Sequence, residues 1–170
     1  FQSTMTLALS VKYTQPPSPG KESAEVRSSI VSLPSFEETN STNDIVEKLA
    51  RDGVKEGVVV FAEAQTKGRG RLGRTWLSPP RRGLWFSVLL RPDLRPQAAT
   101  QLTVAAATAL VRAIREQTGL APEIKWPNDI LIKGRKVAGV LTELSAELDH
   151  VKHLTLGIGV DVNHTASEFP

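Results

Sequence analysis

The sequence predicts one α+β domain with a mixed, largely antiparallel sheet and packed helices. Two stretches have apolar residues at helical spacing, six or seven short runs resemble strands, and most neighbouring runs are joined by short turns. The chain has 170 residues, of which 40% are apolar and 23% charged, so it is long enough to bury one core. This composition excludes a collagen, a coiled coil and a wholly disordered chain.

The N-terminal part differs in composition from the rest. Residues 1–27 are polar, contain three closely spaced prolines and are expected to form a flexible arm. The opening Phe-Gln-Ser is interpreted as the remnant of a cleaved tag. We expect the folded domain to span 28–170 and to begin with a short strand over 30–33.

Two helices are predicted from capping signals and apolar spacing. Residues 40–44 (NSTND) can accept from free backbone N–H groups, which favours a helix over 42–51 that ends at Gly53. The second helix is predicted over 96–117, where Ala, Leu and Val dominate, with a proline in its first turn and Gly119 as its stop. The second helix is expected to lie in the core.

Short β-branched and apolar runs supply the strands. They are assigned to Val58–Phe61, Leu84–Leu90, Glu123–Trp126, Ile130–Lys133, Lys136–Leu144 and Leu154–Val162, with Gly134-Arg135 as a hairpin-like turn. None approaches the roughly 20 apolar residues of a membrane-spanning helix. The chain has no cysteine, which suits a reducing compartment, and we expect the cytoplasm.

Positive charge is concentrated in one segment. The formal net charge is +3, and six of the cations fall in an acid-free stretch: Lys67, Arg69, Arg71, Arg74, Arg81 and Arg82. Without these six the chain would carry net negative charge. This distribution fits a localised anion, such as a nucleotide phosphate, better than a broad nucleic-acid footprint.

The segment 65–76 reads QTKGRGRLGRTW. Its glycines let the backbone approach a ligand closely, and its arginines present planar forks suited to phosphate and carboxylate oxygens. It lacks the Gly-Lys-Ser/Thr of a Walker loop, and no helix follows as in a dinucleotide fingerprint. Taken alone, these residues leave an anion clamp and a solvated or nucleic-acid-binding basic loop equally open.

Other motifs have a functional and a plain structural interpretation. In KWPND, Lys125 could stabilise negative charge in a site, although a surface lysine before a turn is the simpler interpretation. The Ser-Thr-Asn at 41–43 could cap the helix and face a polar ligand at the same time. Glu143 is interpreted as a surface carboxylate and GIGV at 157–160 as packing. His150 and His153 lack a third ligand nearby, so no metal site is expected.

Five motifs occur in a characteristic order: STND at 41–44, GRGRLGRTWLSP at 68–79, LWFSVLLRP at 84–92, KWPNDILIKGRKVAGVLTE at 125–143 and GIGVDVN at 157–163. Together they resemble the catalytic domain of the biotin protein ligases, the biotin–[acetyl-CoA carboxylase] ligases, from about Ser28 to the C-terminus. The GRGRxGR and KWPND pair is the most specific part. The resemblance implies the biotin/lipoate ligase-like fold, related to the catalytic domains of class II aminoacyl-tRNA synthetases.

The resemblance also implies a reaction. Biotin and Mg·ATP would give biotinyl-5′-AMP, and the biotinyl group would pass to one lysine of a biotin carboxyl carrier protein domain of acetyl-CoA carboxylase or a related carboxylase. ATP and Mg²⁺ are thus the expected cofactors, with biotin as substrate. A homodimer is one assembly that the resemblance allows, and no membrane partner is expected.

By the same resemblance, single residues acquire roles. Lys125 and Arg71 would be catalytic. Biotin or its adenylate would be bound by Ser41, Thr42, Asn43, Gln65, Arg69, Gly70, Arg71 and Lys125. ATP would be bound by Arg71, Arg74, Trp76 and Asp161.

The chain departs from the family pattern in two respects. Asp161 stands where the family usually has Asn, and the sequence stops at Pro170, before the family's catalytic domain and small β-barrel end. Residues 28–170 are therefore interpreted as an incomplete catalytic domain. No winged-helix pattern precedes it, so no DNA-binding domain is expected.

Two alternatives remain. A lipoate-type ligase would share the fold, but its Arg-Arg…Gly-Gly-Gly signature is missing. A nucleic-acid binder would explain the basic loop, but not Ser41, Gln65 and Lys125 in family order.

Overall fold

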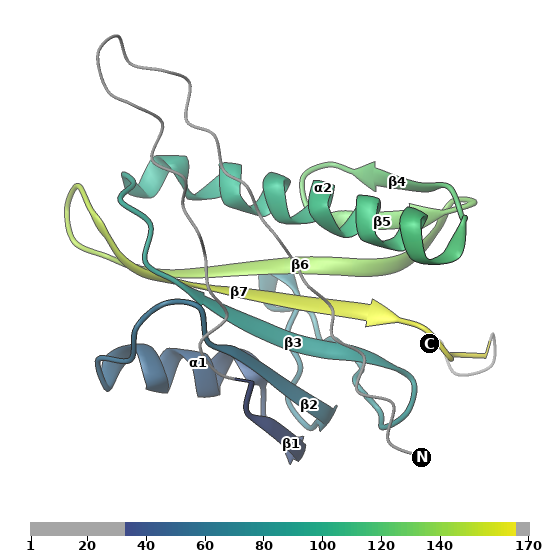
Figure 1. Ribbon diagram of the computed structural model, residues 1–170, viewed down its shortest axis with the longest axis horizontal. Coiled ribbons are helices and arrows are strands. Elements are labelled where there is room, and N and C mark those ends of the chain that lie inside the picture. The colour runs from purple at the N-terminus through teal and green to yellow at the C-terminus, as the bar shows by residue number, and fades with distance from the viewer. Residues whose placement is uncertain (1–32, 166–170) are drawn as a thin grey trace, which may run out of the picture.

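The computed structural model describes residues 33–165 and contains a seven-stranded sheet in the order β1-β2-β3-β7-β6-β5-β4. The strands are β1 (Ser35–Thr39), β2 (Val59–Gln65), β3 (Gly83–Leu90), β4 (Pro122–Lys125), β5 (Asp129–Ile132), β6 (Arg135–Ala146) and β7 (Val151–Asp161). Among the strands within 33–165, only the β1–β2 pair is parallel. The expected mixed, largely antiparallel α+β fold is therefore confirmed (Figure 1).

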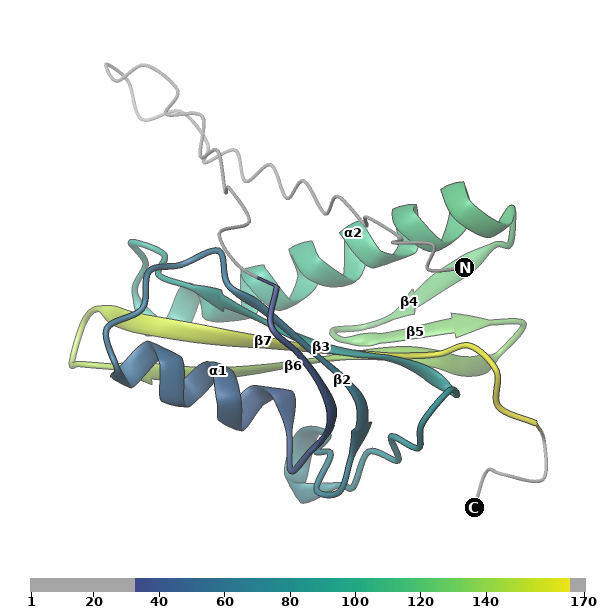
Figure 2. The same ribbon diagram turned by 60° about the horizontal axis from the view of Figure 1, so that its bottom comes forward.

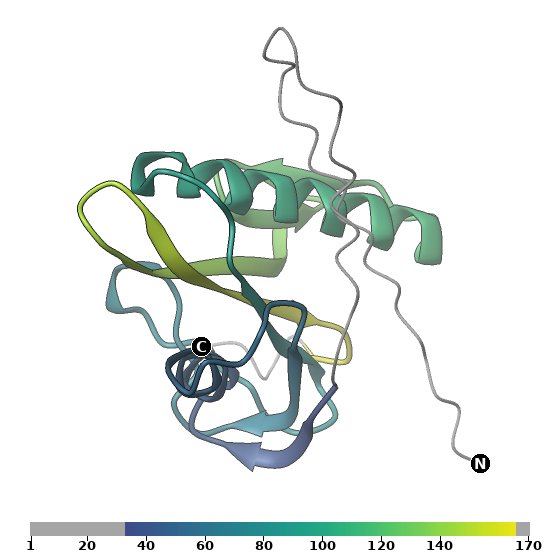
Figure 3. The same cartoon turned by 60° about the vertical axis from the view of Figure 1, so that its left-hand side comes forward.

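Two α-helices cover opposite faces of this sheet: α1 (Thr42–Arg51) and α2 (Ala99–Thr118). Successive residues of a strand point to opposite faces, and the two cores follow this alternation along β3. Phe86 belongs to the core that includes α2, whereas Leu89 packs with Val46 of α1. Figures 2 and 3 show the two helices separated by the sheet.

The helices lie close to where capping signals placed them. The α1 bounds are those predicted, and the hydroxyl of its N-cap, Ser41, accepts from the Asn43 backbone N–H at 3.3 Å. The predicted second helix divides into a 3₁₀ turn, η2 (Pro96–Ala98), and α2. Gly119 ends α2 with a φ of 69°, a left-handed conformation that favours glycine.

Two strand predictions need correction. Residues 30–32 of the first predicted strand lie outside the described residues, and Leu33 is not in a strand; the first strand described is β1. Its polar SFEET gives no apolar period, because β1 is an edge strand held by its parallel pairing with β2. The β5–β6 turn is formed by Lys133 and Gly134, both with positive φ, and Arg135 already belongs to β6.

None of the helices within 33–165 is long and apolar enough to span a membrane.

Candidate active site

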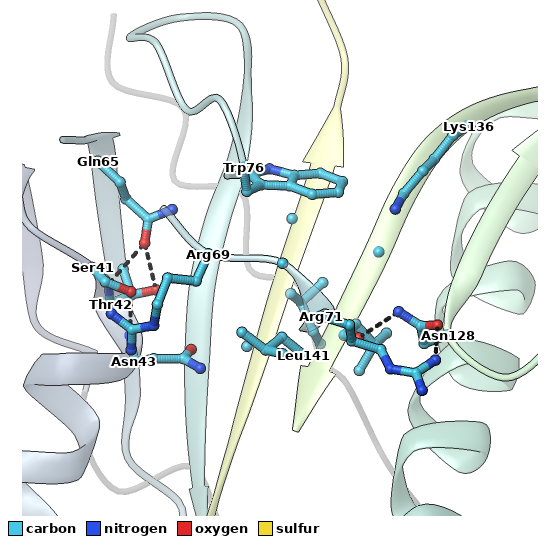
Figure 4. A pocket seen from close by; sticks show the side chains of 16 residues that line it. Ser41, Thr42, Asn43, Gln65, Arg69, Arg71, Trp76, Asn128, Lys136 and Leu141 are labelled. Atoms are coloured by element: carbon cyan, nitrogen blue, oxygen red, sulfur yellow. Dashed lines mark hydrogen bonds between the residues drawn. The ribbon is translucent and has the colours of Figure 1, made fainter. Parts of the chain in front are cut away.

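A pocket lies on the α1 face of the sheet, where β6 and β7 run side by side (Figure 4). It is lined by Ser41, Thr42, Asn43, Gln65, Arg69, Gly70, Arg71, Trp76, Asn128, Lys136, Gly139, Val140, Leu141, Gly157, Ile158 and Gly159. These residues come from the start of α1, the end of β2, the basic loop after it, the turn before β5, the start and middle of β6, and the middle of β7. Eight residues assigned to ligand binding from the sequence are thus brought together.

Glycines form the floor of the pocket. A Cβ on Gly157 would collide with the amide of Asn43, and one on Gly159 would lie 2.6 Å from the indole nitrogen of Trp76. Gly139 and Gly159 are paired across β6 and β7, and the Trp76 ring lies against both. Glycine inside a strand often marks such a close approach. The GIGV segment, interpreted from the sequence as packing, therefore helps to shape the pocket.

The end of the pocket near the start of α1, called the neutral end below, is formed by hydroxyls and amides. The Gln65 Oε1 atom accepts from the Thr42 backbone N–H at 2.8 Å and from its hydroxyl at 3.1 Å. The same Thr42 hydroxyl lies 2.7 Å from Ser87 Oγ, which donates to Asn43 Oδ1 at 2.5 Å. Ser41, Thr42, Asn43 and Ser87 are all buried. This network holds the amides and hydroxyls in fixed orientations.

Arg69 connects this neutral end to the basic loop. Its Nη2 lies 2.8 Å from the Asp44 carboxylate of α1 and 3.2 Å from the Glu143 carboxylate of β6. Hydrogen bonds and charge attraction from these acids, Asp44 first, raise the pKa of Arg69. Glu143 also accepts from Asn43 Nδ2 at 2.7 Å. Glu143 is therefore at the surface, as interpreted from the sequence, but it also joins the start of α1 to the basic loop.

The opposite end of the pocket carries cations. Arg71 Nη1 donates to Asn128 Oδ1 at 2.9 Å, and Asn128 Nδ2 donates to the Val140 carbonyl at 3.1 Å. The Lys136 ammonium lies 2.7 Å from an Asp129 carboxylate oxygen and 4.9 Å from the centroid of the Trp76 ring. Figure 4 shows Arg71 and Lys136 on the far side of Trp76 from Ser41 and Gln65. The pocket thus joins a neutral polar end to a cationic end.

Three residues assigned from the sequence do not line the pocket. Lys125 is exposed at the end of β4, opposite Asp129, which in turn pairs with Gly139. Directly opposed residues of an antiparallel sheet lie on the same face. Lys125 therefore lies on the face of the sheet that carries the pocket, two strands away from Gly139. Arg74 is exposed in the loop. The roles given to both residues stay predictions.

Asp161 lies at the end of β7, on the same face as Gly157 and Gly159. Its carboxylate lies 3.3 Å from His164 Nε2. Burial raises the pKa of Asp161, while the charges of His164 and Lys136 act in the opposite direction. The side chain therefore places a half-buried carboxyl group close to the cationic end.

The sequence interpretation missed several lining residues. Asn128 was regarded only as a turn residue, and Lys136 had no assigned role. For Gly139, Gly157 and Gly159 a signal existed, because glycines inside strands indicate close approach of a ligand or another group. Within residues 33–165, no three His, Cys, Asp or Glu side chains are grouped so that they could hold a metal ion.

Comparison with known sequences supports one family. Residues 35–161 match the biotin/lipoate A/B protein ligase family. The chain is 47% identical over 131 residues to the bifunctional ligase/repressor BirA of Bacillus subtilis, covering 77% of this chain and 40% of that protein. It is 42% identical over 126 residues to the biotin–[acetyl-CoA-carboxylase] ligase of Paracoccus denitrificans, covering 73% and 52%. The chain thus spans about half the length of these curated relatives, or less.

Solved structures give a consistent result. A biotin protein ligase from Aquifex aeolicus in complex with biotin and ATP superposes with a TM-score of 0.66 at 38% identity, covering 82% of this chain and 55% of that one. The biotin protein ligase of Leishmania major in complex with biotinyl-5-AMP gives a TM-score of 0.64 at 28% identity, covering 81% and 61%. Both likenesses extend over most of the described fold.

Proposed function

This chain belongs to the biotin/lipoate A/B protein ligase family, and from that premise we propose that it activates biotin with ATP and passes the biotinyl group to a lysine of an acceptor protein. The observation that carries the proposal is the polarity of the pocket, with fixed neutral groups at one end and Arg71 and Lys136 at the other. Biotin has the same polarity, because a neutral ureido ring and a carboxylate stand at opposite ends of the molecule.

The neutral end suits a ureido group. A ureido carbonyl accepts hydrogen bonds and its two N–H groups donate them, so a matching site needs both donors and acceptors without net charge. Ser41, Thr42 and Gln65 offer hydroxyls and an amide held by their own network. The dithiolane ring of lipoate makes no comparable hydrogen bonds, so it would leave these buried groups unpaired. A site built to hydrogen-bond its ligand strongly rejects a ligand that lacks the matching groups. This favours biotin over lipoate.

The cationic end suits the activation step. A carboxylate oxygen of biotin attacks the α-phosphorus of ATP, the bond from that phosphorus to the bridging oxygen breaks, and pyrophosphate leaves. Negative charge grows on the phosphate oxygens, so fixed guanidinium and ammonium groups stabilise the transition state. Arg71 is held toward this end by its bond to Asn128. Mg²⁺ enters with ATP as part of the substrate.

In the second step an acceptor lysine attacks the acyl carbon of biotinyl-5′-AMP. The mixed-anhydride C–O bond breaks, AMP leaves, and the amine loses its proton to give an amide. We include in the proposal a biotin carboxyl carrier protein domain as acceptor and the cytoplasm as the setting. The family likeness supports this acceptor, since one relative is named a biotin–[acetyl-CoA-carboxylase] ligase.

The experiment is biotin-dependent exchange of labelled pyrophosphate into ATP by this chain, with lipoate as the parallel substrate. Exchange with biotin and not with lipoate is the expected result. Thr42→Val should weaken biotin binding about 10-fold, because it removes a buried hydroxyl from the network. Thr108→Val is the matched control, since that hydroxyl is exposed on α2 and bonds only its own helix. Exchange that needs no biotin, or that lipoate supports equally, would contradict the proposal.

A further inference from the structure

A buried histidine outside the pocket is bonded to the helix that begins at the neutral end. The His153 side chain is 6% exposed, and its Nε2 lies 2.7 Å from a carboxylate oxygen of Glu47 in α1. A carboxylate accepts hydrogen bonds, so the histidine nitrogen donates. The other Glu47 oxygen lies 3.5 Å from Arg51 Nε, so the carboxylate is held from two sides.

His153 belongs to a row of β7 residues that faces α1. Thr155 is paired with Leu89 of β3, and the Leu89 side chain packs with Val46 of α1. Directly opposed residues share a face of the sheet, and so do alternate residues of one strand. His153 and Thr155 therefore face α1 together with Gly157, which meets the Asn43 amide. Both polar side chains of this row are buried.

α1 thus contacts the sheet in two ways. Over β2 and β3 it packs apolar side chains, with Val46 and Ala50 beside Val60 and Leu89. Apolar burial is not directional, so it leaves the position of a helix along its own axis weakly defined. Hydrogen bonds depend closely on distance and angle, and these are the contacts that α1 makes with β7. The polar contacts therefore define how far α1 lies along the strand.

A second polar link joins the same parts of α1 and β7. The Arg91 guanidinium donates to the Ala50 carbonyl in the last turn of α1 at 2.8 Å and to the Lys152 carbonyl of β7 at 3.2 Å. Lys152 is the neighbour of His153 in the strand. The C-terminal half of α1 is therefore attached to the start of β7 by one side-chain pair and one guanidinium bridge.

The opposite end of this helix carries the groups of the neutral end. Asn43 lies one turn before Glu47 on the same side of α1, and Thr42 bonds to Gln65. A helix of ten residues moves as one body, so a displacement along β7 carries both residues with it. Their hydrogen bonds weaken steeply when distance and angle change.

We propose that His153 is a positioning residue for biotin binding. Its bond to Glu47 sets where α1 lies along β7, and so where Thr42 and Asn43 meet the ureido ring. This inference rests on the proposed function and adds to it a pair of residues that do not touch the ligand. The pair acts on ground-state binding of biotin and leaves the cationic end unchanged.

The test is the biotin dependence of pyrophosphate exchange in His153→Leu, which removes the donor and keeps an apolar side chain. The KM for biotin should rise about 10-fold while kcat stays within about 2-fold, because binding is lost equally from the ground state and the transition state. The KM for ATP should not change. His153→Gln, whose amide can donate from about the place of Nε2, should restore the KM for biotin to within about 3-fold of wild type.

Two further variants separate positioning from general stability. Glu47→Ala removes the same bond from its more exposed partner, so it should raise the KM for biotin equally and add nothing to His153→Leu in the double variant. Thr103→Val is the matched control, because it breaks the 2.7 Å bond from Thr103 of α2 to Thr142 of β6 on the other face of the sheet. This control should lower the melting temperature and leave the KM for biotin unchanged.

The outcomes distinguish this inference from the function on which it rests. A biotin KM within about 2-fold of wild type in folded His153→Leu would overturn the positioning role and leave the function standing. An equal rise in Thr103→Val, or a failure of His153→Gln to restore binding, would also overturn it. If His153→Leu does not fold, Glu47→Ala decides by the same criterion. A wild-type chain that neither binds biotin in calorimetry nor shows biotin-dependent exchange would contradict the proposed function itself.

Discussion

The two ends of the pocket are organised in different ways. At the neutral end, Thr42, Asn43 and Gln65 form hydrogen bonds with other side chains and backbone groups of the protein. The groups in these hydrogen bonds are buried or half-buried. At the cationic end, Arg71 and Lys136 each have one strong side-chain partner and keep further donors facing the pocket or solvent. One end is preorganised by a network and the other by single contacts.

This difference indicates how the two ends would recognise their ligands. A neutral ring must be matched in direction by several fixed donors and acceptors, because each unpaired buried group costs about 1–3 kcal/mol. An anion can be held by a few charged donors that adjust, because charge-assisted hydrogen bonds are about twice as strong as neutral ones. Mutations at the neutral end should therefore affect binding, whereas those at the cationic end should affect chemistry and retention of the adenylate.

The largest effect is expected for Arg71→Ala. Loss of this guanidinium should slow adenylate formation about 100- to 1,000-fold and release biotinyl-5′-AMP faster, while biotin affinity changes little. Pyrophosphate exchange and the off-rate of the adenylate are the measurements, with Arg115→Ala on the exposed part of α2 as the control.

Arg71→Ala also distinguishes adenylate binding from nucleic-acid binding by the basic loop. If the loop bound nucleic acid, Arg71→Ala would remove about one phosphate contact and lower the salt slope of binding by about one unit. An unaltered adenylate off-rate together with a shallower salt slope would therefore support nucleic-acid binding.

A smaller effect is expected at the neutral end from Gly157→Ala. The new methyl group would displace the Asn43 amide, which bonds to Ser87 and Glu143. Breaking these bonds should weaken biotin binding about 10- to 100-fold. Calorimetry gives the dissociation constant, and a melting curve shows whether the variant remains folded. Unchanged affinity in a folded variant would mean that the network does not orient the ligand.

The smallest effect concerns the half-buried carboxyl group of Asp161. Because burial raises its pKa above that of the unfolded chain, its contribution to stability is lost as the pH rises through the folded-state pKa. Asp161→Asn should therefore raise the melting temperature by a few degrees at pH 7 and by less at pH 4. The exposed Asp149→Asn is the control. A gain that does not grow with pH would show that the charge of Asp161 is well compensated.

Local patterns were sufficient for much of the fold. The α1 bounds follow from the Ser41 cap and the apolar spacing after it, and Gly119 ends α2 in the conformation that glycine favours. The first strand was misplaced, because β1 is polar and depends on its pairing with β2 rather than on its own sequence. Edge strands of this kind carry little periodic signal.

Residues of the candidate site could be predicted only where they belong to a recognised sequence motif. The Ser-Thr-Asn cap and the GRGR segment converge on one pocket, as expected from the resemblance. Lys136 could not be found by alternation, because a one-residue bulge at Val137 reverses the face on which it lies. The bonds from Glu143 to Asn43 and Arg69 join residues far apart in sequence, which no local pattern reports.

The central claim is that one pocket binds a neutral ring and an anion at its opposite ends. The most direct test is calorimetric titration of this chain with biotin and with a non-hydrolysable biotinyl-5′-adenylate analogue, each at two salt concentrations. We predict that the analogue binds at least about 100-fold more tightly than biotin, because it adds the contacts of the cationic end. We also predict that its affinity falls with salt. Equal affinities for the two ligands, or an analogue affinity independent of salt, would contradict the account.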